Sequence, residues 1–181
     1  AWHMTYNLPV IITNCSNNFG PWQFPEKLIP NTILKALALQ KIPVYGNGEN
    51  IRDWLFVDDH VDALIIAAQN GRLGSNYCIG GDCERKNIEV VNLICNIISD
   101  LKNNGINYSE LISFVSDRPG HDLKYSIDIS NIRNELKWSP KSEFKINLIN
   151  TVKWYSENLN WCKEISLKAN YRGDRLGKIK K

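Results

Sequence analysis

The sequence predicts an α/β fold, because short apolar strands alternate with segments of helical periodicity. Residues 8–13 (LPVIIT) form an unbroken, β-branched apolar run, which predicts a strand covered on both faces. Residues 14–26 are rich in Asn, Gly and Pro, which predicts a loop at the carboxyl end of that strand. Open α/β sheets bind their ligands at this position.

After this loop, the sequence predicts a helix and two short extended segments. Pro30 opens a helix that runs to about Gln40, because the apolar residues recur at helical spacing. Residues 43–45 and 53–57 are predicted to be short extended segments, separated by a Gly-rich turn.

The middle of the chain predicts two helices around a second buried strand. Asp58 or Asp59 caps the first helix. Its apolar face recurs every three or four residues and consists of Val61, Leu64, Ile65 and Ala68. The strand is expected at residues 76–79. Asn87 is expected to cap a long helix that ends at residues 103–105.

The last third predicts two short strands and two helices. The strands are expected at residues 112–115 and 124–127. One helix starts at Ser130 and runs through Trp138. The final helix is defined by apolar residues at Leu148, Val152, Tyr155 and Leu159.

The composition excludes several classes of protein. Of the 181 residues, 43% are hydrophobic and 23% are charged, which excludes a disordered or collagen-like chain. A net charge of +3 is too small to indicate a nucleic-acid partner, and the basic excess lies in residues 163–181. The five cysteines lack CxxC spacing, which favours a reducing, cytoplasmic setting. No apolar stretch approaches the roughly 20 residues that span a membrane.

Common catalytic and metal-binding motifs are absent from the sequence. It contains no GxGxxG loop after a strand, no GxxxxGK[ST], no GxSxG and no HExxH. His3, His60 and His121 have no metal-ligand spacing, so no metal site is expected. Residues 58–60 (DDH) are interpreted as a charged helix start.

Residues 117–122 (DRPGHD) are the most informative short string. The central Pro-Gly favours a type II turn, which brings Arg118 and His121 within ~7 Å of each other. A guanidinium and an imidazole that converge suit a diphosphate, because arginine donates two parallel hydrogen bonds and an anion favours protonated histidine. A surface turn with a local Arg and Asp pair explains the string equally well.

Other residues also have two explanations. Tyr45 could stack against a base or pack in the core. Arg52 follows a Gly-rich turn, where a lone arginine is more often structural. Asn17 and Asn18, at a strand end, could orient a ligand through their amides or could form a turn.

Together these strings resemble the dTDP-glucose 4,6-dehydratase family of nucleotide-sugar dehydratases, in the extended short-chain dehydrogenase/reductase group. The resemblance covers about residues 1–160. Its strings, in family order, are TNCSNNFGP (13–21), FPEKLIP (24–30), PVYGNGENIRDWLFVDDH (43–60), YCIGG (77–81), KNIEVV (86–91), DRPGHD (117–122) and WSP (138–140). Related epimerases and decarboxylases usually lack the double Asn and the His of DRPGHD.

The resemblance implies an NAD-dependent reaction. In the family, NAD accepts hydride from C4 of the glucose, water is eliminated across C5 and C6, and the hydride returns to C6. The product is a 4-keto-6-deoxy sugar. The resemblance places Asn18 beside the nicotinamide.

It also implies how the dTDP-sugar is bound. Asn17 contacts the sugar and diphosphate, and Lys27 and Leu28 line the substrate site. Around thymine the family packs Pro43, Val44 and Tyr45. The diphosphate is held by Arg52, Asn87, Arg118 and His121.

The fold implied by the resemblance is the carboxyl-terminal part of a Rossmann-like, NAD-binding enzyme with its substrate-binding cap. Residues 1–30 correspond to the last part of the dinucleotide-binding domain and the active-site loop. Residues 31–160 correspond mostly to the cap with returning sheet segments, and residues 161–181 form a basic tail. The family's Gly-rich loop, acid and base carboxylates and Tyr-x-x-x-Lys pair belong before residue 1. We therefore expect no catalytic residue in this chain and no activity from it alone.

Two explanations compete for a chain of this extent. Either a separate or preceding amino-terminal half completes a dehydratase, or the chain is a non-catalytic nucleotide-sugar binding module. Another nucleotide-sugar epimerase or dehydratase activity is an alternative, as is a basic-tail nucleic-acid binder from an unrelated class. The resemblance implies a homodimer whose contacts lie mostly in the family's first half, so the oligomeric state of this chain is left open. Neither a nucleic acid nor a membrane is expected as a partner.

Overall fold

The computed structural model describes residues 1–141 and 143–171. The chain forms two compact units. Unit 1 comprises Ala1–Phe19, Arg52–Glu84 and Tyr125–Phe144, and unit 2 comprises Gly20–Ile51, Arg85–Lys124 and Lys145–Lys181. Each unit is therefore assembled from stretches that are far apart in the sequence.

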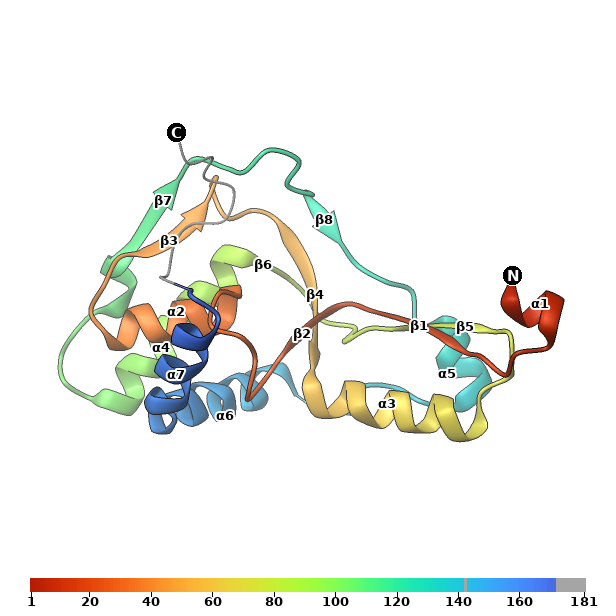
Figure 1. The fold of residues 1–181 in the computed structure, drawn as a ribbon. Coiled ribbons are helices and arrows are strands. Elements are labelled where there is room, and N and C mark those ends of the chain that lie inside the picture. The colour runs from red at the N-terminus through yellow and green to blue at the C-terminus, as the bar shows by residue number, and fades with distance from the viewer. Residues whose placement is uncertain (142, 172–181) are drawn as a thin grey trace. The chain divides into compact units, whose positions relative to one another are not determined.

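Unit 1 is built around a parallel strand pair with helices packed against it (Figure 1). Its helices are α1 (Trp2–Tyr6), α3 (Val57–Asn70) and α5 (Ser130–Leu136). The pair consists of β1 (Ile12–Cys15) and β5 (Asn76–Ile79), with Ile12 opposite Asn76. Helices α3 and α5 contact β5 and each other. The core between them includes Leu55, Ala63, Tyr77, Ile132 and Trp138.

A second sheet contains the strand that follows the predicted active-site loop. β2 (Asn17–Phe19) pairs in parallel with β4 (Ile51–Phe56), so that Asn18 lies opposite Leu55. β6 (Glu84–Lys86) and β8 (Lys124–Tyr125) also pair with β4. Four consecutive residues of β4, 52–55, are buried, which makes it the covered strand of this sheet.

The expectation of a first strand at residues 8–13, covered on both faces, is wrong in position and burial. β1 begins at Ile12, whose side chain is 57% exposed, and its residues alternate between exposed and half-buried. The helices of unit 1 cover one face of the pair, so only every second residue of β1 reaches the core. The predicted loop at 14–26 is also partly wrong, because it contains β2.

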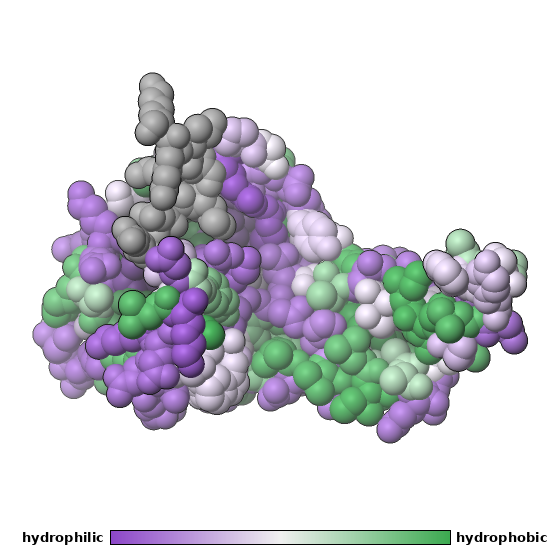
Figure 2. All heavy atoms as spheres, viewed as in Figure 1, coloured by the Kyte–Doolittle hydropathy of each residue, from purple (hydrophilic) through white to green (hydrophobic). Residues whose placement is uncertain are grey.

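The predicted helix after β4 exists, but its buried face is wrong. The helix turns toward the core with Ala63 and Ala67, which are almost fully buried. The four apolar residues predicted to face the core are instead exposed: Val61, Leu64, Ile65 and Ala68. Figure 2 shows apolar surface in the region of α3. Asp58 and Asp59 lie in the first turn, and Phe56 occupies the cap position.

Unit 2 combines a parallel strand pair with packed helices (Figure 1). β3 (Ile42–Tyr45) pairs with β7 (Ile112–Val115), with Tyr45 opposite Val115. Helices α2 (Leu28–Leu37) and α4 (Asn87–Lys102) pack against each other, and α4 also contacts the short 3-10 helix η1 (Tyr108–Leu111). The remaining helices are α6 (Phe144–Glu157) and α7 (Leu159–Lys168).

Most predicted elements of unit 2 are confirmed, with changed ends. Strands 43–45 and 112–115 correspond to β3 and β7, and the expected long helix is α4. Asn87 is the first residue of α4 rather than its cap, which is Lys86. The predicted final helix is divided, because α6 ends at Glu157 and α7 begins at Leu159.

Two further elements are shorter than predicted, and the basic tail is partly helical. The strand expected at 124–127 covers only Lys124–Tyr125, and the helix from Ser130 ends at Leu136. Part of the predicted tail forms α7, in which Cys162 is buried. The rest of the tail, from residue 172, lies outside the described residues.

Candidate functional site

The predicted site residues of unit 1 lie on neighbouring strands. Asn17 pairs with Trp54, and Arg52 precedes Trp54 by two residues on β4. Because side chains two apart on a strand share a face, Asn17 and Arg52 project from the same face of this pair. Arg52 is only 8% exposed.

Asn18 projects from the opposite face and has a defined amide orientation. Its Nδ2 donates to the carbonyl oxygen of Ser16 at 3.1 Å. Its Oδ1 lies 2.8 Å from Nδ1 of His60, in the first turns of α3. Burial lowers the pKa of His60 from its usual value of 6.5, which favours the neutral ring.

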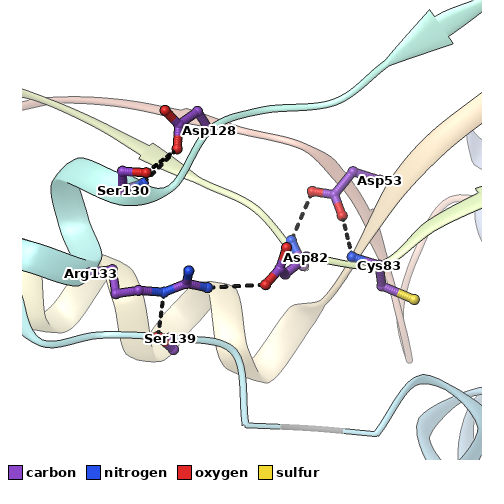
Figure 3. Close-up of polar contacts among 8 residues, drawn as sticks. Asp53, Asp82, Cys83, Asp128, Ser130, Arg133 and Ser139 are labelled. Carbon is purple, nitrogen blue, oxygen red and sulfur yellow. Dashed lines mark hydrogen bonds and ion pairs between the residues drawn. The ribbon is translucent and has the colours of Figure 1, made fainter.

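Asp53 organises the backbone of the glycine turn after β5 (Figure 3). Its carboxylate accepts hydrogen bonds from the N–H of Gly81 at 2.9 Å and from the N–H of Cys83 at 2.8 Å. A Cβ at Gly81 would lie 1.8 Å from the carbonyl oxygen of Trp54, so only glycine allows this close approach. Gly81 therefore serves the close packing of this turn against β4.

Unit 2 brings Tyr45 and His121 together. Their rings meet edge to face, with centroids 6.3 Å apart. Nδ1 of His121 lies 2.7 Å from Oδ1 of Asp117, and the same oxygen accepts the backbone N–H of Arg118 at 2.8 Å. The hydrogen bond with His121 lowers the pKa of Asp117 most, followed by smaller contributions from Arg118. The carboxylate therefore fixes the orientation of the imidazole.

The turn between Arg118 and His121 has the predicted form. Gly120 has a φ of 66°, in the left-handed region that a type II turn requires after its proline. The Arg118 side chain is exposed at the start of this turn. The structure thus brings the imidazole and the tyrosine ring together at the turn that carries Arg118.

Asn87 lies beside the turn that follows Tyr45. Its N–H donates to the carbonyl oxygen of Asn50 at 2.9 Å, and the N–H of Ile88 donates to Gly48 at 3.0 Å. The side-chain oxygen of Asn87 is buried and has no hydrogen-bond partner among the described residues. A buried acceptor of this kind is suited to a ligand donor.

The other predicted substrate residues differ in exposure. Val44 is 2% exposed, so its side chain packs in the core, while Pro43 and Tyr45 are half-buried on the opposite face of β3. Lys27 is exposed at the start of α2 and pairs with Glu26 at 2.7 Å. Leu28 is half-buried in the first turn.

Two residues with direct contacts to the candidate site were not predicted. His60 was interpreted only as part of a charged helix start, and Asp117 only as one half of a local ion pair. No sequence signal identified the His60 contact, because 42 residues separate it from Asn18. The Asp117 contact could have been found, because i and i+4 positions around a tight turn lie close together.

Residues 1–141 and 143–171 contain neither a candidate membrane-spanning helix nor a candidate metal cluster. No helix in them is long and apolar enough to cross a membrane. They contain no group of three or more His, Cys, Asp or Glu side chains arranged to hold a metal ion.

The fold matches that of half of a short-chain dehydrogenase/reductase protein. A structure of dTDP-glucose 4,6-dehydratase from Bacillus anthracis in complex with NAD superposes with a TM-score of 0.82 at 43% identity, covering 91% of this chain and 50% of that one. The dTDP-glucose 4,6-dehydratase DesIV from Streptomyces venezuelae, also with NAD bound, has a TM-score of 0.83 at 40% identity, covering 91% and 49%. The predicted α/β fold class is confirmed.

Residues 1–151 match the family profile described as GDP-mannose 4,6 dehydratase, and the chain belongs to this family. It is 51% identical over 183 residues to a dTDP-glucose 4,6-dehydratase of Escherichia coli, covering 99% of this chain and 50% of the relative. The corresponding enzyme of Neisseria meningitidis is 50% identical, with 98% and 51% covered. The predicted resemblance is confirmed, and the chain spans about half the length of the curated relatives it matches.

Proposed function

We propose that this chain carries the nucleotide-sugar binding residues of an NAD-dependent dTDP-glucose 4,6-dehydratase. The observation that supports this most directly is the cluster of Tyr45, Asp117 and His121 next to the turn that presents Arg118. It combines an aromatic ring with cationic groups, which suits a base and a diphosphate. Two dTDP-glucose 4,6-dehydratases are 51% and 50% identical to this chain over the aligned residues, which supports dTDP-glucose as the substrate.

The proposed diphosphate contacts use both kinds of cation. The guanidinium groups of Arg52 and Arg118 offer paired donors to phosphate oxygens. A protonated His121 donates from both nitrogens, from Nδ1 to Asp117 and from Nε2 to a phosphate. Asn87 completes this group as a donor through its Nδ2, while its buried Oδ1 is left to accept from another group of the ligand.

The remaining contacts are with the base and the sugar. In this proposal Tyr45 stacks against thymine beside Pro43, and Val44, whose side chain is buried, contributes through its backbone. Asn17 binds the sugar and diphosphate. Lys27 and Leu28 line the sugar end of the site.

The described residues near Asn18 fit the polar end of a nicotinamide. Ser16 is 5% exposed, and its Oγ has no hydrogen-bond partner in the described part of the chain. A buried hydroxyl and an oriented amide suit a carboxamide, which both donates and accepts. NAD, when bound, supplies the hydride acceptor for the temporary oxidation at C4. We also propose a cytoplasmic location, because the described cysteines are all free thiols.

Titration with dTDP tests the diphosphate contacts. Charge-assisted hydrogen bonds contribute about 1.5–3 kcal/mol, so Arg52→Ala or Arg118→Ala should weaken binding roughly ten- to a hundredfold. Lysine at either position should restore only part of the affinity, since it keeps the charge and loses the fork. Arg72→Ala is the control, because Arg72 makes an exposed pair with Glu135 at 3.2 Å. Unchanged dTDP affinity in both site variants would refute the proposed contacts.

Conversion of dTDP-glucose, by the chain alone and by a joined protein, tests the catalytic part of the proposal. We expect the 181-residue polypeptide to give no 4-keto product alone, and to give product when joined to the amino-terminal half of the E. coli relative. Product from the polypeptide alone contradicts this expectation. A joined protein that binds dTDP-glucose and produces nothing favours the binding-module alternative.

A further inference from the structure

We propose that His60 is a positioning residue, which holds the Asn18 side-chain amide at the cofactor through a hydrogen bond from Nδ1 to Oδ1. The role at the cofactor rests on the proposed function, while the hydrogen bond itself does not. All three partners, Ser16, Asn18 and His60, belong to unit 1.

The direction of the hydrogen bond follows from the partners. The Ser16 carbonyl oxygen can only accept, so the group of Asn18 facing it at 3.1 Å must be the NH2. The carbonyl oxygen of the amide therefore faces His60 at 2.8 Å. Because an amide oxygen cannot donate, Nδ1 of His60 must carry the hydrogen.

The fold explains why His60 reaches Asn18. Asn18 pairs with Leu55 on β4, and α3 begins directly after β4 at Val57. His60 is the fourth residue of α3 and therefore lies within one helical turn of the strand end. The contact depends on the β2–β4 register, which joins residues that are 42 positions apart.

The two hydrogen bonds act on opposite ends of one amide. The Ser16 carbonyl holds the nitrogen and His60 holds the oxygen, so rotation about the last side-chain bond of Asn18 would break both. Partial burial of His60 lowers its pKa and favours a neutral ring, whose tautomer is set by its hydrogen-bond partner. A residue that contacts a ligand directly is usually held in position by hydrogen bonds from its neighbours, which gives the site its geometric precision.

Nitrogen-15 NMR of the 181-residue chain at neutral pH tests the hydrogen bond directly. We expect a neutral His60 ring protonated at Nδ1, and loss of this tautomer preference in Asn18→Ala. His3 and His121 bond to Leu8 and Asp117 instead, so their signals should not change in that variant. A His60 ring protonated at Nε2, or an unchanged tautomer in Asn18→Ala, would overturn the proposal.

A matched pair of variants tests the positioning role in the joined protein. In His60→Leu no donor is left, and in His60→Asn the side-chain NH2 can take the place of Nδ1–H. We expect His60→Leu to lower kcat about three- to tenfold, with the KM for dTDP-glucose within about twofold, and His60→Asn to restore most of the rate. His3→Leu makes the same substitution at a histidine outside the site and should leave kcat unchanged.

The outcomes separate this inference from the proposed function. Equal rates for His60→Leu and His60→Asn in a joined protein that converts dTDP-glucose would overturn the positioning role alone. Failure of the joined protein to convert dTDP-glucose, with His60 protonated at Nδ1 and responsive to Asn18→Ala, would contradict the proposed function and support the hydrogen bond.

Discussion

Replacement of Asp53 by alanine should destabilise unit 1 far more than the same change at Asp82, although both carboxylates make polar contacts around the same turn (Figure 3). Asp53 is 2% exposed and accepts two backbone hydrogen bonds, from Gly81 at 2.9 Å and Cys83 at 2.8 Å. Hydrogen bonds to a charged group contribute about 1.5–3 kcal/mol each. We expect Asp53→Ala to lower the free energy of unfolding by about 3–6 kcal/mol, because both N–H groups lose their acceptor.

Asp82 supplies the matched control. Its carboxylate pairs with Arg133 at 3.0 Å, and the two side chains are 68% and 46% exposed. Exposed ion pairs contribute about 0–1 kcal/mol, so Asp82→Ala should have a small effect. Asp53→Asn keeps one acceptor oxygen and should fall between the two alanine variants, which gives a measurable variant if Asp53→Ala does not fold.

Two assays separate the global effect from the local one. Urea unfolding gives the change in free energy, and amide hydrogen exchange reports the two N–H groups themselves. Exchange at Gly81 and Cys83 should accelerate in the Asp53 variants and stay slow in Asp82→Ala. If Asp53→Ala and Asp82→Ala are equally stable, or if both amides keep their protection, the carboxylate does not hold this turn.

Three further predictions concern reactivity, pH and surface. Burial raises the pKa of the Cys95 thiol to about 11, which leaves it almost entirely protonated at pH 8. Iodoacetamide at pH 8 should therefore label the half-buried Cys83 in the native chain, and Cys95 only after denaturation. Equal labelling of the two cysteines in the native chain, measured by peptide mass spectrometry, would refute this. The pKa of Asp117 lies below its usual 3.8, so the stability from its histidine pair should be complete above about pH 4 and lost as the pH falls further. Melting temperatures from pH 3 to 6 should therefore converge for the native chain and Asp117→Asn at the acid end, and a constant difference would contradict it. The exposed apolar face of α3 should cause self-association. The double variant Leu64→Lys, Ile65→Lys should reduce both the apparent size of the protein in sizing experiments and its binding of an apolar dye. Undiminished dye binding by this variant would contradict the prediction.

The sequence by itself determined the elements that depend on local chemistry. Proline and glycine at positions 119 and 120 predicted the turn, because proline restricts φ and glycine accepts the left-handed value of 66° observed there. Apolar spacing predicted α4, whose inward face contains Val91, Ile94 and Ile98. The order of short strings was enough to predict the family.

The tertiary structure decided which side of α3 is buried. The sequence offered a larger apolar stripe at Val61, Leu64 and Ile65, yet the described core of unit 1 receives Ala63 and Ala67. A periodic pattern states which residues share a face but not which neighbours will cover it. Because alanine side chains are small, a helix can approach its neighbours closely along them. Which face of α3 is buried therefore depends on packing across the whole unit.

The site contacts were also decided by tertiary structure. Asn18 meets His60 through the β2–β4 register, and Asp53 meets Gly81 and Cys83 through the path of the chain from β5 to β6. Residue type predicted that these groups could form hydrogen bonds, but not with which partner. Hydrogen bonds act over about 3 Å, so partners separated by tens of residues are selected only when strand pairing brings them within that distance.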